Sequence, residues 1–427
     1  MKTEKDSYEM EGDAKKRRID ETEQTTEDMT IHSLDDETEV DANECVVFHQ
    51  VTVIELENGT KRLVQLCPEF KPGMTHQIFE NEKITGVQNP HVDIYFNPST
   101  GDMCVYVTCD SVAEEKKKLI RKVRKWVAPN ANINRTIFIE RIFQSETDFK
   151  PSGVLLDSYM YQEKEFNIFL STLTSPESVQ FFNNIQSLGY WFIDGASEIV
   201  VVPDSQHRWL ILTLYTTTND HWILVGYCFL YVFTNPFTSP CYSLRLCQIL
   251  ILPCYQKQGH SAHIFDVIYR ILMHTSPSQY LPNSYPSEEN QSGCCNYYMF
   301  TVEDPCEEFT FVRDVVDCRI LKSNVIMLSY LMSEGIKEFT KDDIERIRCS
   351  LGINSVQLQK CYNILLHHRY SNIDSKEYRL FIKRQLSVLY REDLELIRDQ
   401  DMFKNSLDSY FHSTEDYYNR VCCVVFK

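Results

Sequence analysis

The sequence predicts an α+β protein: a mixed central sheet with flanking helices, preceded by an N-terminal α+β domain and followed by a C-terminal helical domain. Short alternating or continuous apolar segments, such as residues 45–56, recur through the first two thirds of the chain. Helical periodicity dominates the last hundred residues. The 427 residues are 43% hydrophobic and 12% aromatic, which is enough for two or three domains with their own cores.

Residues 1–45 are expected to form a disordered acidic tail. They hold 6 Lys and Arg against 16 Asp and Glu, with almost no aromatic residues. The run KKRR (15–18) is interpreted as a nuclear import signal, and an ordinary charge cluster is the alternative.

The N-terminal α+β domain is predicted for residues 46–160. Two strands at 45–56 and 61–66 flank the turn ENGT, and a hairpin spans 91–110 with its turn at NPSTG. Residues 114–127 form an amphipathic helix with a basic face, which is either solvated or contacts a coenzyme phosphate or a partner.

The central domain is predicted for residues 161–330. It begins with a helix at 175–193, which Ser175 caps and Pro176 starts. Further segments are then expected in order: β segments at 197–202, 209–217, 222–233 and 243–252, a helix after the loop at 256–262, a flexible insert at 275–296, a strand at 297–304 and a helix from 305.

The C-terminal helical domain is predicted for residues 331–427. A helix begins at the Thr340 cap and ends at Gly352, and helical patterns continue through 354–372 and 374–401.

Composition also narrows the functional classes. The sequence contains no signal-peptide pattern and no apolar run of bilayer length, so no membrane association is expected. The 16 cysteines include no C-x-x-C, so they are interpreted as small hydrophobes in a reducing compartment, with no metal site. The body carries a net charge of −8, which disfavours direct nucleic-acid binding and suits basic partners.

The stretch QKQGHSA (256–262) lies between an apolar strand and a helix. Unpaired N–H groups at a helix N-terminus attract anions, and small residues such as Gly259 allow a close approach. The stretch is therefore a candidate phosphate loop, although a glycine before a helix is common. His260 could act as an acid or base, but its backbone N–H is the better candidate. Cys254 has no paired base and is interpreted as packing.

QKQGHSA resembles the coenzyme A loop of GNAT-type N-acetyltransferases. Over residues 60–395 the chain further resembles the type B histone acetyltransferase catalytic subunits. The pieces that carry this resemblance are MTHQIFENE, DFKPSGVLLDSY, WFIDGAS, LVGYCFLYVF, QILILPCYQKQGHSA, TVEDP with VRD, and YRLFIKRQL. The resemblance implies a GNAT-type central domain, acetyl-CoA as co-substrate and the N-terminal tail of histone four as substrate.

The resemblance also implies coenzyme-binding residues. The strand would present its backbone to the pantetheine arm, and the loop would wrap the pyrophosphate with its N–H groups. These residues are Ile249, Leu250 and Ile251 on the strand, and Gln256, Lys257, Gln258, Gly259, His260, Ser261 and Ala262 in the loop. Ser261 stands where the family prefers Gly, and a position that required positive φ would weaken coenzyme binding.

Acetyl transfer to lysine needs a base, because the ammonium, with a pKa near 10.4, cannot attack until it loses a proton. By resemblance, Glu303 is the general base and Asp304 its acidic neighbour. Asp194 stands where relatives have Glu and is expected to act through water or through its charge. From the residues alone, Glu-Asp-Pro is also a common helix entry.

Substrate contacts follow from the same resemblance. Tyr231, Val232 and Phe233 match a tail-contacting strand, with core packing as the alternative. Glu80 and Glu82 match an acidic loop that contacts the histone, although Lys83 stands where an acid is expected. The implied partners are the histone four tail with its histone three partner and a WD-repeat histone chaperone, in the nucleus and cytoplasm.

Two other functions fit the same residues. One is acetylation of a different basic protein or a polyamine, and the other is a histone-binding carrier with weak catalysis.

Overall fold

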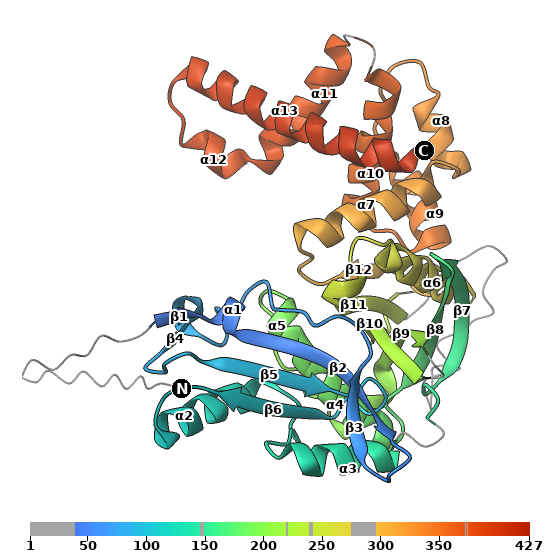
Figure 1. The fold of residues 1–427 in the computed structure, drawn as a ribbon. Coiled ribbons are helices and arrows are strands. Elements are labelled where there is room, and N and C mark those ends of the chain that lie inside the picture. Colours follow the sequence, from blue (N-terminus) through green and yellow to red (C-terminus); the bar gives the residue numbers. More distant parts are fainter. Residues whose placement is uncertain are drawn as a thin grey trace, which may run out of the picture. The chain divides into compact units, whose positions relative to one another are not determined.

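The computed structural model describes residues 39–145, 149–218, 221–238, 242–274, 296–371, 373 and 375–427. These residues form two sheets with their flanking helices, a two-stranded ribbon and a C-terminal group of helices (Figure 1). The α+β class and the mixed central sheet are therefore confirmed. KKRR (15–18) and all but the last residue of the insert at 275–296 lie outside the described residues.

The first sheet has four strands in the order β3-β2-β5-β6. β2 and β5 are parallel, and the other pairs are antiparallel. The bounds are β2 Val46–Glu55, β3 Lys61–Gln65, β5 His91–Phe96 and β6 Met103–Thr108. The predicted strands at 45–56 and 61–66 and the hairpin at 91–110 are confirmed. Two helices, α2 (Ala113–Val123) and α3 (Arg135–Ser145), bury their apolar faces against this sheet.

Residues 39–45 are ordered, so the predicted tail extends too far. β1 (Glu39–Asp41) pairs with β4 (Lys83–Thr85), and α1 (Ala42–Cys45) follows at once. Asp41 caps α1, and both Ala42 and Cys45 are buried in the core. Burial of these small apolar residues outweighs the local acidity that made the segment appear disordered.

The second sheet has six strands in the order β12-β11-β10-β9-β8-β7. All neighbours are antiparallel except β11 and β12. The bounds are β7 Val154–Tyr161, β8 Lys164–Thr172, β9 Trp209–Thr218, β10 His221–Thr234, β11 Tyr242–Ile251 and β12 Phe300–Val302.

The strands predicted from 209–217, 222–233 and 243–252 are confirmed as β9, β10 and β11. β12 is shorter than the predicted strand at 297–304, and β8 was not predicted. The strand predicted at 197–202 is wrong: the segment has no strand pairing, and Val200 and Val202 are exposed. Residue 160 lies inside β7, and the domain limits at 160 and 330 stay predictions.

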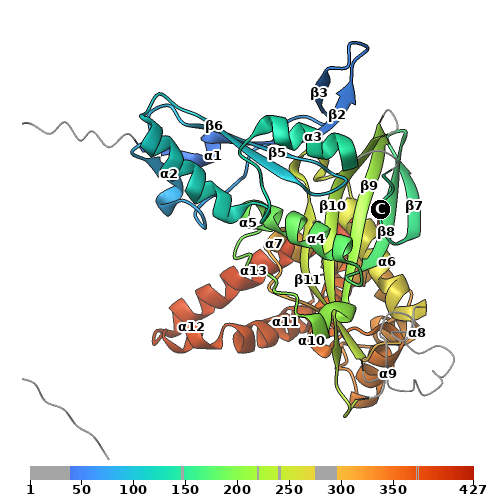
Figure 2. The same ribbon diagram turned by 90° about the horizontal axis from the view of Figure 1, so that it is seen from below.

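Helices cover both faces of the second sheet (Figure 2). On one face, Phe182 of α4 (Pro176–Ile185) contacts Phe229 of β10, with ring centroids 4.6 Å apart. On the other, Phe265 of α6 (His260–His274) contacts Phe300 of β12 at 5.4 Å. The predicted helix at 175–193 is confirmed in part, because it breaks into α4, the 3-10 turn η3 (Gln186–Leu188) and α5 (Gly189–Phe192).

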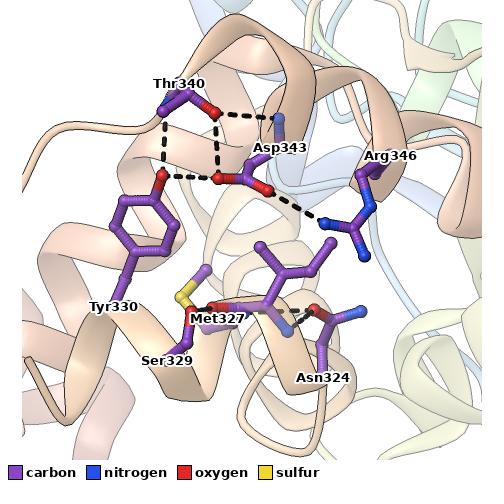
Figure 3. Close-up of polar contacts among 8 residues, drawn as sticks. Asn324, Met327, Ser329, Tyr330, Thr340, Asp343 and Arg346 are labelled. Atoms are coloured by element: carbon purple, nitrogen blue, oxygen red, sulfur yellow. Dashed lines mark hydrogen bonds and ion pairs between the residues drawn. The ribbon is translucent and has the colours of Figure 1, made fainter.

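Helices make up the C-terminal part of the chain, and the predicted cap and end of one helix are confirmed (Figure 3). Thr340 accepts from the Asp343 N–H at 3.1 Å, and Gly352 ends that helix with a φ of 70°. The bounds are α7 Glu307–Leu321, α8 Val325–Leu331, α9 Lys341–Leu351, α10 Ser355–Tyr370, α11 Lys376–Leu389, α12 Arg391–Glu395 and α13 Gln400–Val425.

A buried polar network joins these helices to α6. Asp317 of α7 accepts from the Tyr269 hydroxyl of α6, and Gln357 of α10 donates to both Asp314 (2.9 Å) and Asp317 (2.8 Å). Tyr417 of α13 donates to Asp314. Because the site is fully buried, the pKa of Asp317 rises to about 6.

The end of α9 also holds β12. The Phe300 N–H donates to the Gly352 carbonyl at 2.8 Å, and Arg348 donates to the Tyr298 carbonyl. The helical part of the chain therefore fixes the outermost strand of the second sheet. No helix in the described ranges is long and apolar enough to span a bilayer.

Candidate active site

β11 and β12 separate shortly after they meet. They pair only from Leu244 to Leu246, and the last link is the Glu303 N–H donating to the Leu246 carbonyl at 3.0 Å. Cys247 is the extra residue of a bulge between β11 and β10. Within the described ranges, residues 247–251 pair only with β10, so one backbone edge of β11 is open.

The open edge contains Ile249, Leu250 and Ile251. Leu250 and Ile251 are buried and Ile249 is half-buried, so their side chains pack while the backbone stays at the edge. Gly226 allows β10 to lie close to this segment, because a Cβ there would lie 2.4 Å from the Leu250 carbonyl oxygen.

The loop between β11 and α6 has the shape of an anion cradle. Lys257 and Gly259 have φ values of 61° and 86°, and the helix begins at His260. Among the described residues, the N–H groups of 257–261 have no hydrogen-bond acceptor. Five free amides before a helix N-terminus suit a pyrophosphate. The loop therefore fits the coenzyme that the resemblance implies.

His260 anchors this loop through its side chain. Its Nδ1 lies 2.7 Å from the Tyr159 hydroxyl of β7, and its Nε2 lies 3.3 Å from Gln258 Oε1. Gln258 Nε2 in turn donates to the Cys254 carbonyl at 3.2 Å. Burial lowers the pKa of His260 to about 4, so it is neutral near pH 7. These contacts support a structural role and disfavour an acid–base one.

Three other loop residues complete this region. Gln256 Nε2 donates to the Ile251 carbonyl at 2.9 Å, so its amide ties the loop to β11. Ser261 and Ala262 lie within the first turn of α6, and the positive φ values fall on Lys257 and Gly259 instead. The departure at Ser261 is therefore compatible with the backbone of the loop.

Glu303 is exposed at the end of β12, beside the bulge. The Cys247 thiol donates to the Arg245 carbonyl at 3.9 Å. Burial, helped by the nearby Glu303 charge, raises the pKa of Cys247 to about 12. Cys247 therefore stays a thiol beside Glu303. Asp304 follows with a φ of 32° and an exposed side chain, in a strained turn before Pro305.

Tyr231 and Phe233 lie on the same sheet face as Arg245 and Thr301, because Tyr231 is paired with Arg245 and Arg245 with Thr301. The Arg245 guanidinium lies 4.6 Å from the Phe233 ring centroid. Phe233 is 39% exposed and Tyr231 half-buried, whereas Val232 points into the core. An aromatic surface therefore adjoins Glu303 along the strands.

Asp194 lies in a second acidic group. His76 Nε2 lies 3.1 Å from Asp194 Oδ1, and His76 Nδ1 lies 3.8 Å from Glu82 Oε1. The Thr75 N–H donates to Glu82 at 2.7 Å and, as the largest cause, lowers the pKa of Glu82. His76 was not among the predicted site residues, and its only signal in the sequence is its place in MTHQIFENE.

The remaining predicted residues lie beside this group. Glu80 is exposed in the turn η1 (Glu80–Glu82). Lys83, which departs from the expected acid, forms an ion pair with Glu39 of β1. The positive charge of Lys83 is thus neutralised by Glu39.

Among the described residues, no hydrogen bond or ion pair joins the two acidic groups, and α5 lies between them. A Cβ at Gly189, the first residue of α5, would lie 3.3 Å from Gln248 Oε1 of β11, and Asp194 follows the end of this helix. The structure thus brings Glu303 and Asp304 together with the β11 edge, and Asp194 together with Glu82.

Two other features of the structure add no site residues. A cavity of about 740 Å³ between α3 and α4, lined by Arg141 and Gln180 among others, contains no predicted site residue. In the described ranges, no group of three His, Cys, Asp or Glu side chains could hold a metal ion.

Known proteins resemble this chain along most of its length. Residues 38–194 match the family "Histone acetyl transferase HAT1 N-terminus". A histone acetyltransferase type B catalytic subunit of Dictyostelium discoideum is 26% identical over 355 residues, covering 78% of this chain and 68% of that protein. The subunit of Mus musculus is 24% identical, covering 76% of each chain. That of Cryptococcus neoformans is 24% identical, covering 84% of this chain and 90% of its own.

These similarities agree with the geometry of an open strand edge, a free amide loop and a carboxylate at the strand end. They confirm the resemblance to the type B catalytic subunits and, with it, the enzyme class, an acetyltransferase.

Proposed function

We propose that this protein transfers an acetyl group from acetyl-CoA to lysines in the N-terminal tail of newly synthesised histone four. The main support for this proposal is that the free amides of 257–261 and the Glu303 carboxylate both adjoin the open edge of β11. A phosphate anchor and a base on one strand edge suit the binding of a long acyl carrier and the deprotonation of an amine.

In this proposal the reaction is a direct transfer in a ternary complex. Residues 256–262 hold the pyrophosphate, and the backbone of Ile249–Ile251 aligns the pantetheine arm. Acetyl-CoA supplies the acetyl group. Glu303 accepts the proton of the lysine ammonium directly or through water, and the neutral amine attacks the thioester. Asp304 adds negative charge that favours the cationic lysine.

Side chains around this edge fit a basic, extended peptide. Tyr231 and Phe233 offer an aromatic wall for a lysine stem. Glu82 and Asp194, held by His76, offer a second acidic point for a basic residue elsewhere in the tail. Glu80 adds charge beside them. A substrate with several spaced cations would engage both points, whereas a small amine would engage one.

The similar proteins are histone acetyltransferases, which supports histones as the substrate class of this proposal. We further propose that histone four is presented with its histone three partner and a WD-repeat chaperone, and that the protein acts in the nucleus and the cytoplasm. Separate fractionation of cells that express a tagged full-length chain tests the last point.

One assay tests the function. The protein is incubated with acetyl-CoA and either a histone-four tail peptide or spermidine, and products are mapped by mass spectrometry. We expect acetylated peptide lysines and a fall of about 100-fold or more in turnover for Glu303→Gln. Glu307→Gln, an exposed acid on the next helix, serves as the matched control.

The alternative outcomes decide between functions. Acetylation of spermidine without the peptide would replace histone by a polyamine substrate. Tight peptide binding without acetylation would indicate a carrier. Full activity of Glu303→Gln across pH would remove Glu303 as the base.

A further inference from the structure

Two cysteines far apart in the sequence meet beside the coenzyme loop. Cys254 lies in the turn η5 (Pro253–Tyr255), directly before Gln256, and Cys67 follows β3 of the first sheet. Their Sγ atoms lie 3.7 Å apart, although 187 residues separate them. Both are free thiols, so the structure shows the reduced pair. The contact corrects the interpretation of Cys254 as packing alone.

Burial distinguishes this pair from Cys318 and Cys361, which also lie close together. Cys67 and Cys254 are both half-buried. The Cys318 thiol donates to the Cys361 backbone carbonyl at 3.9 Å, and both cysteines are fully buried in the helical region. The structure thus contains a half-buried thiol pair at the predicted active site and a fully buried pair of cysteines away from it.

The two thiols also differ chemically. The hydrogen bond between the two thiols lowers the pKa of Cys254, while the same hydrogen bond and burial raise the pKa of Cys67. The thiolate is the nucleophilic form of cysteine, and a thiolate with a neighbouring thiol is the usual arrangement of an oxidisable pair.

We propose that Cys67 and Cys254 are a modification site for peroxides, at which a reversible disulfide forms and weakens coenzyme binding. The Cys254 thiolate attacks one oxygen of hydrogen peroxide and becomes a sulfenic acid, and the leaving hydroxide takes up a proton to form water. The Cys67 sulfur then attacks the sulfenic sulfur, and its proton leaves with the hydroxyl group as a second water. The two thiols lose two electrons, and the peroxide gains them.

Closure of the disulfide must move the loop. The sulfurs have to approach from 3.7 Å to about 2.05 Å. Cys254 carries the carbonyl that accepts from Gln258, and Gln258 contacts His260 at the start of α6. A shift of Cys254 therefore reaches the amides of 257–261. This consequence rests on the proposed coenzyme site, whereas the disulfide itself does not.

Peptide mapping tests the disulfide. The full-length protein is treated with hydrogen peroxide, its remaining thiols are blocked, and it is digested without reductant. We expect one peptide pair joined through Cys67 and Cys254, two hydrogens lighter than the reduced pair and separated again by dithiothreitol. Cys109→Ser, a half-buried cysteine elsewhere, should leave this product unchanged. Absence of the linked pair, or preferential linkage of other cysteines, would overturn the proposal.

Coenzyme affinity tests the consequence. Acetyl-CoA binding is measured by calorimetry on reduced and oxidised protein, with Cys67→Ser and Cys67→Ala treated in parallel. We expect oxidation to raise the Kd about tenfold, which corresponds to about 1.4 kcal/mol, in the wild type but in neither variant. A linked pair with unchanged Kd would overturn the effect on binding. Reduced protein that binds no acetyl-CoA would overturn the proposed coenzyme site, while the peptide map would still decide the disulfide.

Discussion

His76 bridges two acids from distant parts of the chain: its Nε2 lies 3.1 Å from Asp194 Oδ1 and its Nδ1 lies 3.8 Å from Glu82 Oε1. The imidazole thus joins the loop after α5 to the turn before β4. Glu82 is predicted to bind the substrate and Asp194 to take part in catalysis. His76 therefore acts as a positioning residue in the proposed function.

Removal of the bridge should weaken peptide binding more than turnover. In His76→Ala the two carboxylates lose their common partner and can turn to solvent, so we expect KM for a histone-four peptide to rise about three- to tenfold with kcat nearly unchanged. His76→Gln should recover part of the effect. Steady-state kinetics checks this, with His91→Ala, an exposed histidine of the first sheet, as control. A large loss of kcat at constant KM would assign the group to the chemical step instead.

Gly259 should be needed for coenzyme binding because of its backbone conformation. Its φ is 86°, and a Cβ would have no neighbour within 4 Å, so Gly259→Ala introduces strain without a clash. We expect the Kd for acetyl-CoA to rise about tenfold. Gly59→Ala provides a matched control, with a φ of 75° and the same open surroundings in the first sheet.

Ser261 should behave in the opposite way. It lies in the first turn of α6, where any residue can adopt the backbone angles, so Ser261→Gly should leave the acetyl-CoA affinity unchanged. A clearly tighter complex in this variant, measured by calorimetry, would mean that the hydroxymethyl group obstructs the coenzyme.

Asp317 should make stability depend on pH. Its folded pKa of about 6 exceeds the ordinary value of 3.8, so the folded protein binds the proton more tightly than the unfolded chain does. Its contribution is complete below about pH 4 and is lost as the pH rises through 6. Relative to Asp317→Asn, the wild-type free energy of unfolding should fall by on the order of 3 kcal/mol between pH 4 and 6.5.

Urea titrations at a series of pH values measure this difference. Asp416→Asn, which removes an exposed carboxylate from α13, should run parallel to the wild type. Parallel curves for Asp317→Asn as well would show that the buried acid does not titrate in this range.

Thr340 should contribute measurably to the stability of the helical region. Its hydroxyl accepts from the Asp343 N–H and donates to the Asp343 carboxylate, which also accepts from Tyr330 (Figure 3). Thr340→Ala should lower the free energy of unfolding by about 1 kcal/mol, and Thr340→Ser should restore most of it. Thermal unfolding checks both variants. An equal loss in Thr340→Ser would point to the methyl group instead of the cap.

The elements that could be predicted are those with a clear signal in a short stretch of sequence. The apolar runs of β9, β10 and β11 and the cap and glycine of α9 are visible in the sequence because burial and capping act on neighbouring residues. Residues 197–202 show the limit of this reasoning: they have the composition of a strand but no partner strand. Similarly, α4 and α5 share one apolar pattern, yet the chain turns between them where Gly189 packs on β11.

The site divides in the same way. The loop and Glu303 could be found because they are continuous motifs. His76 with Asp194, and Cys67 with Cys254, are separated by 118 and 187 residues, and no local pattern signals that they meet. Such pairs depend on how the first sheet docks on the second, which only the folded chain reveals.

The hydrogen bond from Phe300 to Gly352 gives the helical region a direct role at the candidate active site. Glu303 directly follows a strand of only three residues, and a strand this short has too few ladder hydrogen bonds to fix its own position. Its anchor is a carbonyl at the end of α9, about fifty residues further along the chain. A shortened chain that stops before Gly352 would therefore keep the coenzyme loop but lose the scaffold of the predicted base, so the two halves of the protein are inseparable as a working unit.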